Sequence, residues 1–199
     1  QIAQLCAANV IVSLGHTEAT LTQARAAIAA GARCATHLFN AMSQMGNREP
    51  GMVGAVLTSS IAAGVIADGH HVAVEALRVA VAARPNGLFL VSDCMAAAGS
   101  EATEFTLGGR RILRREGCLR LEDGTLAGAD LTLPQAVRVM VHRVGVPPDR
   151  ALAMATRVPA DVNRRADLGC LSPGAQADMV HLSADFQVQA VWQAGVKRR

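Results

Sequence analysis

Four short apolar runs that alternate with helix-like segments constrain the fold of this chain more than any other feature of its sequence. Each run has the length of a short strand, and together they cover residues 9–14, 33–36, 62–67 and 88–92. Apolar runs in which polar residues do not alternate with apolar ones are typical of strands buried on both faces, as in a parallel sheet covered by helices. The alternation with helices therefore indicates an α/β chain.

Helix signals fill the spaces between these runs. Thr20 and Gln23 have the spacing of a capping box, and Gly31 is a favourable residue for ending the helix that they begin. The apolar spacing of residues 72–83 predicts a second helix, stopped by the Pro-Asn-Gly sequence that follows Arg84. The run HLFNAM, at residues 37–42, predicts the start of another helix whose free N–H groups are able to receive an anion.

Each predicted strand ends at histidine or aspartate residues. His16, His37, His71 and Asp93 follow the four runs in order. In (β/α) barrels the catalytic groups sit at the carboxyl ends of the strands, so these side chains are expected at one shared edge. One histidine after a strand is more often a hydrogen-bonded loop residue, and one aspartate is more often a helix cap. Four in register favour a functional site.

These residue types suit metal-assisted hydrolysis. Two neutral imidazoles from these histidines are suitable ligands for zinc or a similar divalent ion, which lowers the pKa of a bound water. The carboxylate of Asp93 is able to take a proton from that water and return it to a leaving amine. The pattern therefore predicts hydrolysis of an amide-like bond.

Composition argues against several other classes of protein. The formal charge is only +3, and the basic residues are scattered without interleaved aromatic residues, which argues against a nucleic-acid partner. No apolar run reaches the roughly 20 residues needed to cross a membrane. The five cysteines are odd in number and widely spaced, without a CxxC pair. This usage indicates reduced thiols and a cytoplasmic location.

Several longer motifs carry a resemblance to a known family. VSLGHTEAT, ATHLFNAM, GNREPG, IADGHHV, LVSDCMAAAG and GTLAGADLTL occur in this order. With them the chain resembles the N-acetylglucosamine-6-phosphate deacetylases of the amidohydrolase superfamily, and THLFNAM followed by REPG is the specific part. The resemblance implies a TIM-type (β/α)8 barrel. It also implies metal-dependent hydrolysis of N-acetylglucosamine 6-phosphate to glucosamine 6-phosphate and acetate.

The same resemblance assigns roles to individual residues. It implies that His16 and His37 are metal ligands and that Asp93 is the catalytic acid and base. The residues that it implies for substrate binding are Asn40, Ala41, Arg48, Asp68, Gly69, His70, His71, Leu126, Ala127 and Gly128. Arg48 matches an arginine that binds the sugar phosphate across the interface of a homodimer, and residues 126–128 match a backbone segment that closes over the substrate.

The chain also departs from this family. The HLEGP-like motif that carries the third protein ligand, a glutamate, is absent, and Glu18, Glu49 and Glu75 stand in other contexts. A full barrel has eight strands and about 250 residues, whereas four strands are recognisable here. We therefore expect the C-terminal half of the barrel in residues 1–165 and the end of a small β domain in residues 166–199.

Three questions stay open at this point. The metal is expected to be zinc, with iron, cobalt or manganese as alternatives. An N-acetylgalactosamine-6-phosphate deacetylase is an alternative activity, because the contact to the epimeric hydroxyl is not readable from the motifs. A non-catalytic remnant that binds a sugar phosphate is an alternative of another class, because one metal ligand is missing.

Overall fold

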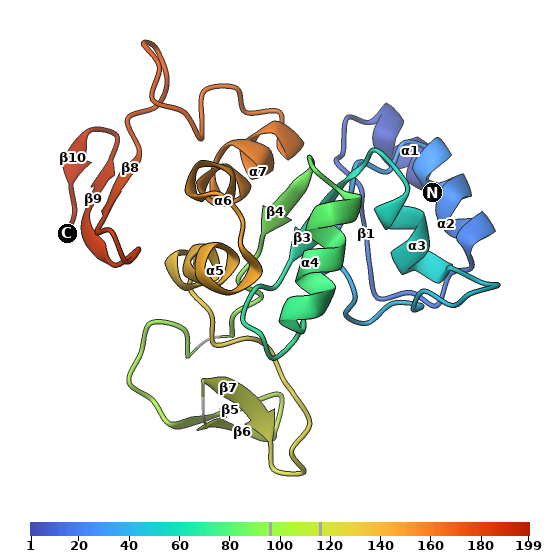
Figure 1. Ribbon diagram of the computed structural model, residues 1–199, viewed down its shortest axis with the longest axis horizontal. Helices are drawn as coiled ribbons and strands as arrows, with labels where there is room; N and C mark the ends of the chain where they lie inside the picture. Colours follow the sequence, from blue (N-terminus) through green and yellow to red (C-terminus); the bar gives the residue numbers. More distant parts are fainter. Residues whose placement is uncertain (96, 116) are drawn as a thin grey trace.

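The computed structural model describes residues 1–95, 97–115 and 117–199, and the four predicted strands form one parallel sheet (Figure 1). The strands lie in the order of the sequence, β1-β2-β3-β4. Their bounds are β1 (Ser13–Leu14), β2 (Cys34–Ala35), β3 (Ala62–Val65) and β4 (Leu88–Leu90). The predicted α/β class and the parallel sheet are confirmed, although each strand is shorter than its apolar run.

Four helices belong to this part of the chain: α1 (Ile2–Ala7), α2 (Leu21–Ala29), α3 (Gly51–Leu57) and α4 (Val74–Ala83). The predicted capping box of α2 is present, because the Thr20 side chain accepts from the N–H of Gln23 and the Gln23 side chain accepts from the N–H of Thr20. All seven residues of α3 are buried. This helix begins after the loop that carries Arg48.

The prediction that residues 37–42 open a helix is wrong. These residues form turns, and the next helix, α3, begins only at Gly51. The physical reason is a backbone that turns left-handed at every second residue, with φ values of 24° at His37, 80° at Phe39 and 48° at Ala41. An α-helix of L-residues needs negative φ throughout, so this segment cannot offer a helix N-terminus to an anion.

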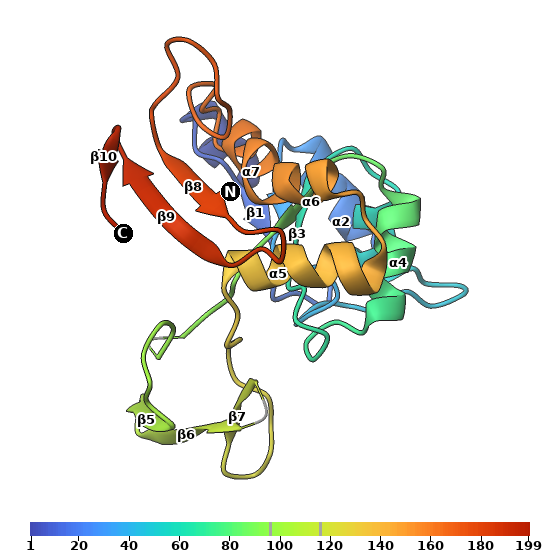
Figure 2. The same cartoon turned by 60° about the vertical axis from the view of Figure 1, so that its left-hand side comes forward.

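The second half of the chain adds three α-helices and a π-helical turn. They are α5 (Leu133–Val139), η1 (Met140–Val144), α6 (Pro148–Ala155) and α7 (Arg157–Val162). Helices α5, α6 and α7 all contact β4, and Figures 1 and 2 show α5 and α6 beside one another. They cover that end of the sheet with buried side chains such as Val137 and Met154.

Two antiparallel sheets complete the described structure. One contains β5 (Glu104–Leu107), β6 (Arg110–Arg115) and β7 (Cys118–Leu121), and the other contains β8 (Met179–Leu182), β9 (Val188–Gln193) and β10 (Val196–Lys197). Both views show the β5-β6-β7 sheet projecting away from the helices, between the end of β4 and the start of α5 (Figure 2). We call it the projecting sheet.

The core lies between the parallel sheet and its helices. Leu38, Ile66 and Leu77 are fully buried there, and burying a side chain of this size contributes about 1.5–3 kcal/mol. Arg84 is buried with them, and its guanidinium donates to the carbonyls of Val56 (2.7 Å), Ser59 (2.6 Å) and Ile61 (2.6 Å). Burial lowers the pKa of Arg84. None of the described helices combines the length and apolar character needed to cross a membrane.

Candidate functional site

The predicted site residues gather at the carboxyl edge of the parallel sheet. His16 follows β1, His37 follows β2, Asp68 follows β3 and Asp93 follows β4. Because neighbouring strands run parallel, their carboxyl ends meet at one edge, where open α/β sheets and barrels bind their ligands. His16 and Asp93 are exposed at this edge, whereas His37 is only 6% exposed.

The backbone at this edge is strained. His16, His37 and Asp93 have φ values of 46°, 24° and 47°, in the left-handed region that residues with a Cβ avoid. Ala41, at 48°, shares this conformation, and its carbonyl accepts from the N–H of Thr17 at 3.0 Å. Residues in such conformations cost about 1–3 kcal/mol each and cluster at functional sites. The strain therefore supports the assignment of this edge as the site.

His16 and His37 face one another. Their ring centroids lie 4.7 Å apart, with an interplanar angle of 75°. The Nδ1 of His37 lies 3.1 Å from the carbonyl oxygen of Asn40. A carbonyl only accepts, so Nδ1 carries the proton in this contact, and in the neutral ring Nε2 keeps its lone pair. His37 is thus held in the tautomer that leaves Nε2 available to a metal ion.

The donor set fits part of a metal site. Within the described ranges there is no group of three or more His, Cys, Asp or Glu residues that could hold an ion. The histidine pair supplies two nitrogen ligands, whereas a catalytic zinc site usually takes three protein ligands. His16 and His37 therefore suit a divalent ion that takes its remaining protein ligand from outside these residues.

Asp68, His71 and Ala127 form a second polar group at the same edge. Asp68 Oδ2 lies 2.6 Å from His71 Nδ1, and His71 Nε2 lies 3.0 Å from the carbonyl oxygen of Ala127. Both partners are acceptors, so both ring nitrogens donate when His71 is protonated. The hydrogen bond to Asp68 raises the pKa of His71 against the opposing effect of burial, and the negative charge of Asp93 adds to the increase.

The carboxylate of Asp68 is also shifted. Burial alone would raise its pKa, but the hydrogen bond from His71 and the N–H groups of His70 and His71, both 2.8 Å from Oδ1, hold the pKa below its usual value. The side chains of His71 and Asp68 are only 8% and 7% exposed. The pair is therefore a buried ion pair over the pH range between the two shifted pKa values.

Gly128 and Ala129 lie directly against Asp93. The N–H of Ala129 donates to the carbonyl oxygen of Asp93 at 2.9 Å, and Ala129 pairs with Cys94 in a parallel bridge. A Cβ at Gly128 would lie 2.4 Å from Met95 Cγ and 3.1 Å from the same Asp93 oxygen, so this close approach favours glycine. No described hydrogen bond engages the Asp93 carboxylate, which leaves it available at the exposed edge.

Four other predicted residues make no described contact with the histidine pair or with Asp93. Gly69 lies between Asp68 and His70, with a φ of 78°. Arg48 is exposed on the loop before α3, and Leu126 lies one residue before the Ala127 contact, in a bridge with Arg120. His70 lines a cavity of about 430 Å³ beside Asp130 and η1. The structure therefore places the His71 ring against the backbone of Ala127, whereas the neighbouring His70 lines the separate cavity beside η1.

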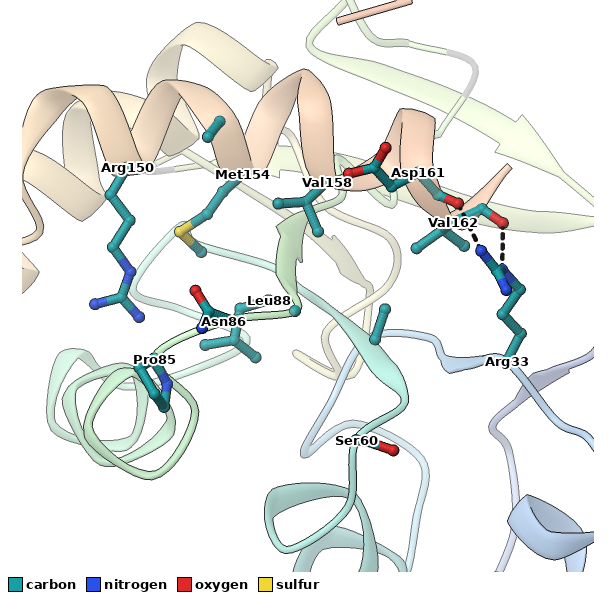
Figure 3. A pocket seen from close by; sticks show the side chains of 13 residues that line it. Arg33, Ser60, Pro85, Asn86, Leu88, Arg150, Met154, Val158, Asp161 and Val162 are labelled. Atoms are coloured by element: carbon teal, nitrogen blue, oxygen red, sulfur yellow. Dashed lines mark hydrogen bonds between the residues drawn. The ribbon is translucent and has the colours of Figure 1, made fainter. Parts of the chain in front are cut away.

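A cavity lies at the opposite, amino-terminal edge of the sheet (Figure 3). It has a volume of about 470 Å³ and lies between the first residues of β3 and β4 and the helices α6 and α7. Arg33 borders it and donates to the carbonyls of Asp161 and Val162, both at 2.8 Å. It contains none of the predicted site residues.

Known proteins resemble this chain in sequence and in fold. The profile of the amidohydrolase family matches residues 1–197. The chain belongs to the amidohydrolase family. Two solved structures show the same fold: an N-acetylglucosamine-6-phosphate deacetylase from Pasteurella multocida (TM-score 0.95, 37% identity, 99% of this chain and 52% of that one) and one from Mycobacterium smegmatis, a mutant in complex with N-acetyl-D-glucosamine-6-phosphate (TM-score 0.88, 40% identity, 98% and 53%).

Curated relatives of this amidohydrolase chain carry two names. The N-acetylgalactosamine-6-phosphate deacetylase of Shewanella sp. (strain ANA-3) is 42% identical over 197 residues, which are 98% of this chain and 50% of the relative. The N-acetylglucosamine-6-phosphate deacetylase of Vibrio furnissii is 36% identical over 196 residues, with shares of 98% and 49%. The chain spans about half the length of both of these relatives.

Sequence reasoning missed several residues that shape this amidohydrolase site. Glu49 was considered only as a ligand, yet its Oε1 accepts from the N–H of Leu21 (2.7 Å) and of Gly51 (3.1 Å), which anchors the Arg48 loop to α2. A glutamate placed near the first turn of a helix is the signal that could have found it. Arg114 was also missed, because no sequence motif marks its partners.

Proposed function

We propose that the protein to which this chain belongs is a metal-dependent deacetylase of N-acetylglucosamine 6-phosphate. It would release acetate and glucosamine 6-phosphate. The observation that carries the proposal is the pair of His16 and His37, with Nε2 of His37 left free by the Asn40 contact, at the same sheet edge as Asp93. The names of the relatives support the substrate class.

In this proposal His16 and His37 hold a divalent ion, with zinc first and iron, cobalt or manganese as alternatives. The ion, when bound, lowers the pKa of water and polarises an amide carbonyl. Asp93 accepts a proton from the attacking water and later gives it to the leaving amine nitrogen. Its carboxylate has no described hydrogen bond that would compete with this role, and the Ala129 contact fixes its backbone.

The remaining residues bind and orient the sugar phosphate. Arg48 binds the phosphate, for which its planar guanidinium is suited, and it does so in the site of the second subunit of a homodimer. His71 lies beside the substrate, and Asp68 holds the orientation of its ring. The strained turn at Asn40 and Ala41 and the segment 126–128 enclose the sugar from two sides.

The same proposal covers the architecture. We propose that β1 to β4 are four of the eight strands of a (β/α)8 barrel, within residues 1–165, and that residues 166–199 belong to a small β domain. The third protein ligand to the metal would then come from another strand of that barrel. Such a division agrees with two histidine ligands at this edge rather than a complete set.

A second candidate function differs from the first only in the epimer of the sugar phosphate. Relatives named for N-acetylgalactosamine 6-phosphate are 42% and 41% identical to this chain, compared with 36% for one named for the gluco-epimer. An assay of acetate release from both sugar phosphates by the complete protein decides between the two epimers. A protein that binds both but releases no acetate from either would be the non-catalytic binder.

Variants of the complete protein test the assigned roles. Asp93→Asn keeps the shape of the side chain but removes the proton acceptor, so kcat should fall by a factor on the order of 10² or more with little change in substrate affinity. His16→Ala and His37→Ala should each lose bound metal. His142→Ala, an exposed histidine on η1, is the matched control and should keep it. Full metal content in both site variants would rule out these ligands.

Mixed dimers test the position of Arg48. Arg48→Ala should weaken binding of the phosphorylated sugar and leave an unphosphorylated one nearly unchanged, because only the phosphate contact is lost. Arg48→Ala subunits combined with Asp93→Asn subunits should regain activity, because one of the two sites then has both residues intact. No gain in a demonstrated mixed dimer would place Arg48 in the site of its own subunit.

A further inference from the structure

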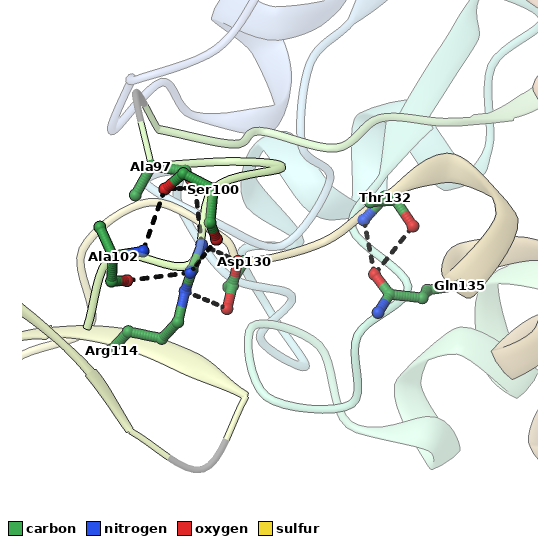
Figure 4. Close-up of polar contacts among 7 residues, drawn as sticks. All are labelled: Ala97, Ser100, Ala102, Arg114, Asp130, Thr132 and Gln135. Carbon is green, nitrogen blue, oxygen red and sulfur yellow. Dashed lines mark hydrogen bonds and ion pairs between the residues drawn. The ribbon is translucent and has the colours of Figure 1, made fainter. Parts of the chain in front are cut away.

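Arg114, on β6 of the projecting sheet, joins segments on both sides of the candidate site. Its Nη1 donates to the carbonyls of Ser100 (2.6 Å) and Ala102 (2.9 Å), and its Nη2 donates to the carbonyl of Ala97 (2.7 Å). The same Nη2 donates to Asp130 Oδ1 at 3.0 Å (Figure 4). One guanidinium therefore connects the segment that leaves Asp93 with the segment that returns to the body of the protein.

The contact with Asp130 uses both oxygens of the carboxylate. Nε of Arg114 lies 2.8 Å from Asp130 Oδ2, at ion-pair distance but without the geometry of a hydrogen bond. The two side chains are 19% and 21% exposed, so solvent screens the pair much less than it screens an exposed one. The single charge of Arg114 is balanced by Asp130, and three carbonyls take its other donors.

Asp130 directly follows the residues that lie against Asp93. The N–H of Ala129 donates to the Asp93 carbonyl, and the carbonyl of Ala127 accepts from His71. Holding Asp130 therefore fixes the end of the segment that contacts both Asp93 and His71. The segment 97–102, which Arg114 holds by its carbonyls, follows Asp93 on the other side.

We propose that the ion pair of Arg114 and Asp130 is a positioning clamp, which holds residues 127–129 against Asp93 and His71 and so sets the geometry of the closed substrate site. This inference rests on the proposed deacetylase function for its catalytic consequence. Arg114 touches no reacting atom. It acts through Asp130 and Ala129, so its loss should reduce activity without removing the proton acceptor or a metal ligand.

Arg111 provides a matched control on the same strand. It pairs with Glu104 and Glu122, which lie within or beside the projecting sheet, and all three side chains are at least half exposed. Arg111→Lys therefore perturbs an arginine–carboxylate contact of β6 without reaching residues 97–102 or 127–130. Any general weakening of the projecting sheet should appear in this control as well.

The test compares Arg114→Lys, Asp130→Asn, the double variant and Arg111→Lys in the complete protein. The kcat/KM for acetate release should fall about tenfold in each clamp variant and no further in the double variant, as expected for two residues that act as one unit. Arg111→Lys should stay within about twofold of the parent. Metal content should be unchanged in all four, because no metal ligand is altered.

Hydrogen exchange at the Ala129 amide provides a readout that does not need activity. Exchange should become about tenfold faster in Arg114→Lys and Asp130→Asn, and stay unchanged in Arg111→Lys, if the clamp holds the Ala129–Asp93 contact closed. If the parent protein releases no acetate from either sugar phosphate, the proposed function fails, and exchange at Ala129 alone decides on the clamp.

Two results would overturn the inference. One is unchanged exchange at Ala129 in both clamp variants, and the other is an equal effect of Arg111→Lys. If Arg114→Lys fails to fold, Asp130→Asn decides, because it leaves the three carbonyl contacts of Arg114 in place.

Discussion

Replacing Asp68 by asparagine should separate the charge of the Asp68–His71 pair from its geometry. In Asp68→Asn the remaining oxygen still accepts from the N–H groups of His70 and His71, as Oδ1 now does at 2.8 Å. The new amide is able to donate to Nδ1 of a neutral His71, whose Nε2 then donates to Ala127. The contacts are therefore kept, and the variant loses the ion pair alone.

The expected cost follows from the kind of hydrogen bond that is lost. A hydrogen bond to a charged group contributes about 1.5–3 kcal/mol and a neutral one about 0.5–1.5 kcal/mol, so the variant should be less stable by ~1–2 kcal/mol where the pair is charged. The two side chains are only 7% and 8% exposed, so screening by solvent reduces this loss of stability only slightly. The pair is charged only within a limited pH window.

The stability difference between the parent and Asp68→Asn therefore depends on pH, in a direction set by the two pKa shifts. The raised pKa of His71 means that its contribution is fully present below its ordinary value of 6.5 and is lost as the pH rises through the raised value. The lowered pKa of Asp68 means that its contribution is present above 3.8 and is lost as the pH falls through the lowered value. The parent should therefore exceed Asp68→Asn in stability most at about pH 6, and the difference should shrink by pH 9.

Urea unfolding of the complete protein at both pH values measures this difference, and NMR titration of the His71 ring measures its pKa directly. In Asp68→Asn the pKa of His71 should fall relative to the parent. Glu75→Gln is the control, because Glu75 forms only an exposed 3.9 Å contact with Arg78. An equal stability difference at pH 6 and pH 9, or an unchanged pKa of His71, would refute the reasoning.

Two further predictions concern stability. Ala41→Gly should raise the free energy of unfolding by ~0.5–1 kcal/mol, because glycine relieves the left-handed strain at φ 48° at a small entropic cost, and a lower thermal midpoint would contradict this. Arg84→Met should lower the free energy of unfolding by about 3–5 kcal/mol, because three buried carbonyls lose a charged donor. The control Arg25→Met, at an exposed position on α2, should change the urea midpoint little.

The parts of the fold that the sequence predicted are those with local signals. Apolar runs followed by histidine or aspartate located β1 to β4, and the Thr20–Gln23 spacing located the start of α2. The turn at residues 37–42 was not predictable in this way, because its left-handed positions are occupied by His37, Phe39 and Ala41. Left-handed turns are signalled by glycine or asparagine, and tertiary contacts replace that signal here.

For the site, the sequence predicted which residues gather at the edge but not what holds them. His71 contacts the backbone carbonyl of Ala127, which is 56 residues away. Every residue has such a carbonyl, so no residue type in the sequence marks this contact. Arg114 and Asp130 are 16 residues apart on either side of a turn, a spacing without helical or strand periodicity. Such contacts depend on how the projecting sheet folds back toward β4.

The connections between strands have a consequence for the order in which this chain folds. Strands β5 and β6 are joined by Gly108 and Gly109, both with positive φ, as a tight hairpin requires, and such hairpins form in about 1–10 μs. Strands β1 to β4 pair only across helical crossovers, and pairing between distant residues slows folding. We therefore expect the hairpin of the projecting sheet to form before the parallel sheet is complete, so that the contacts of Arg114 and Ala129 with the rest of the chain are made after it.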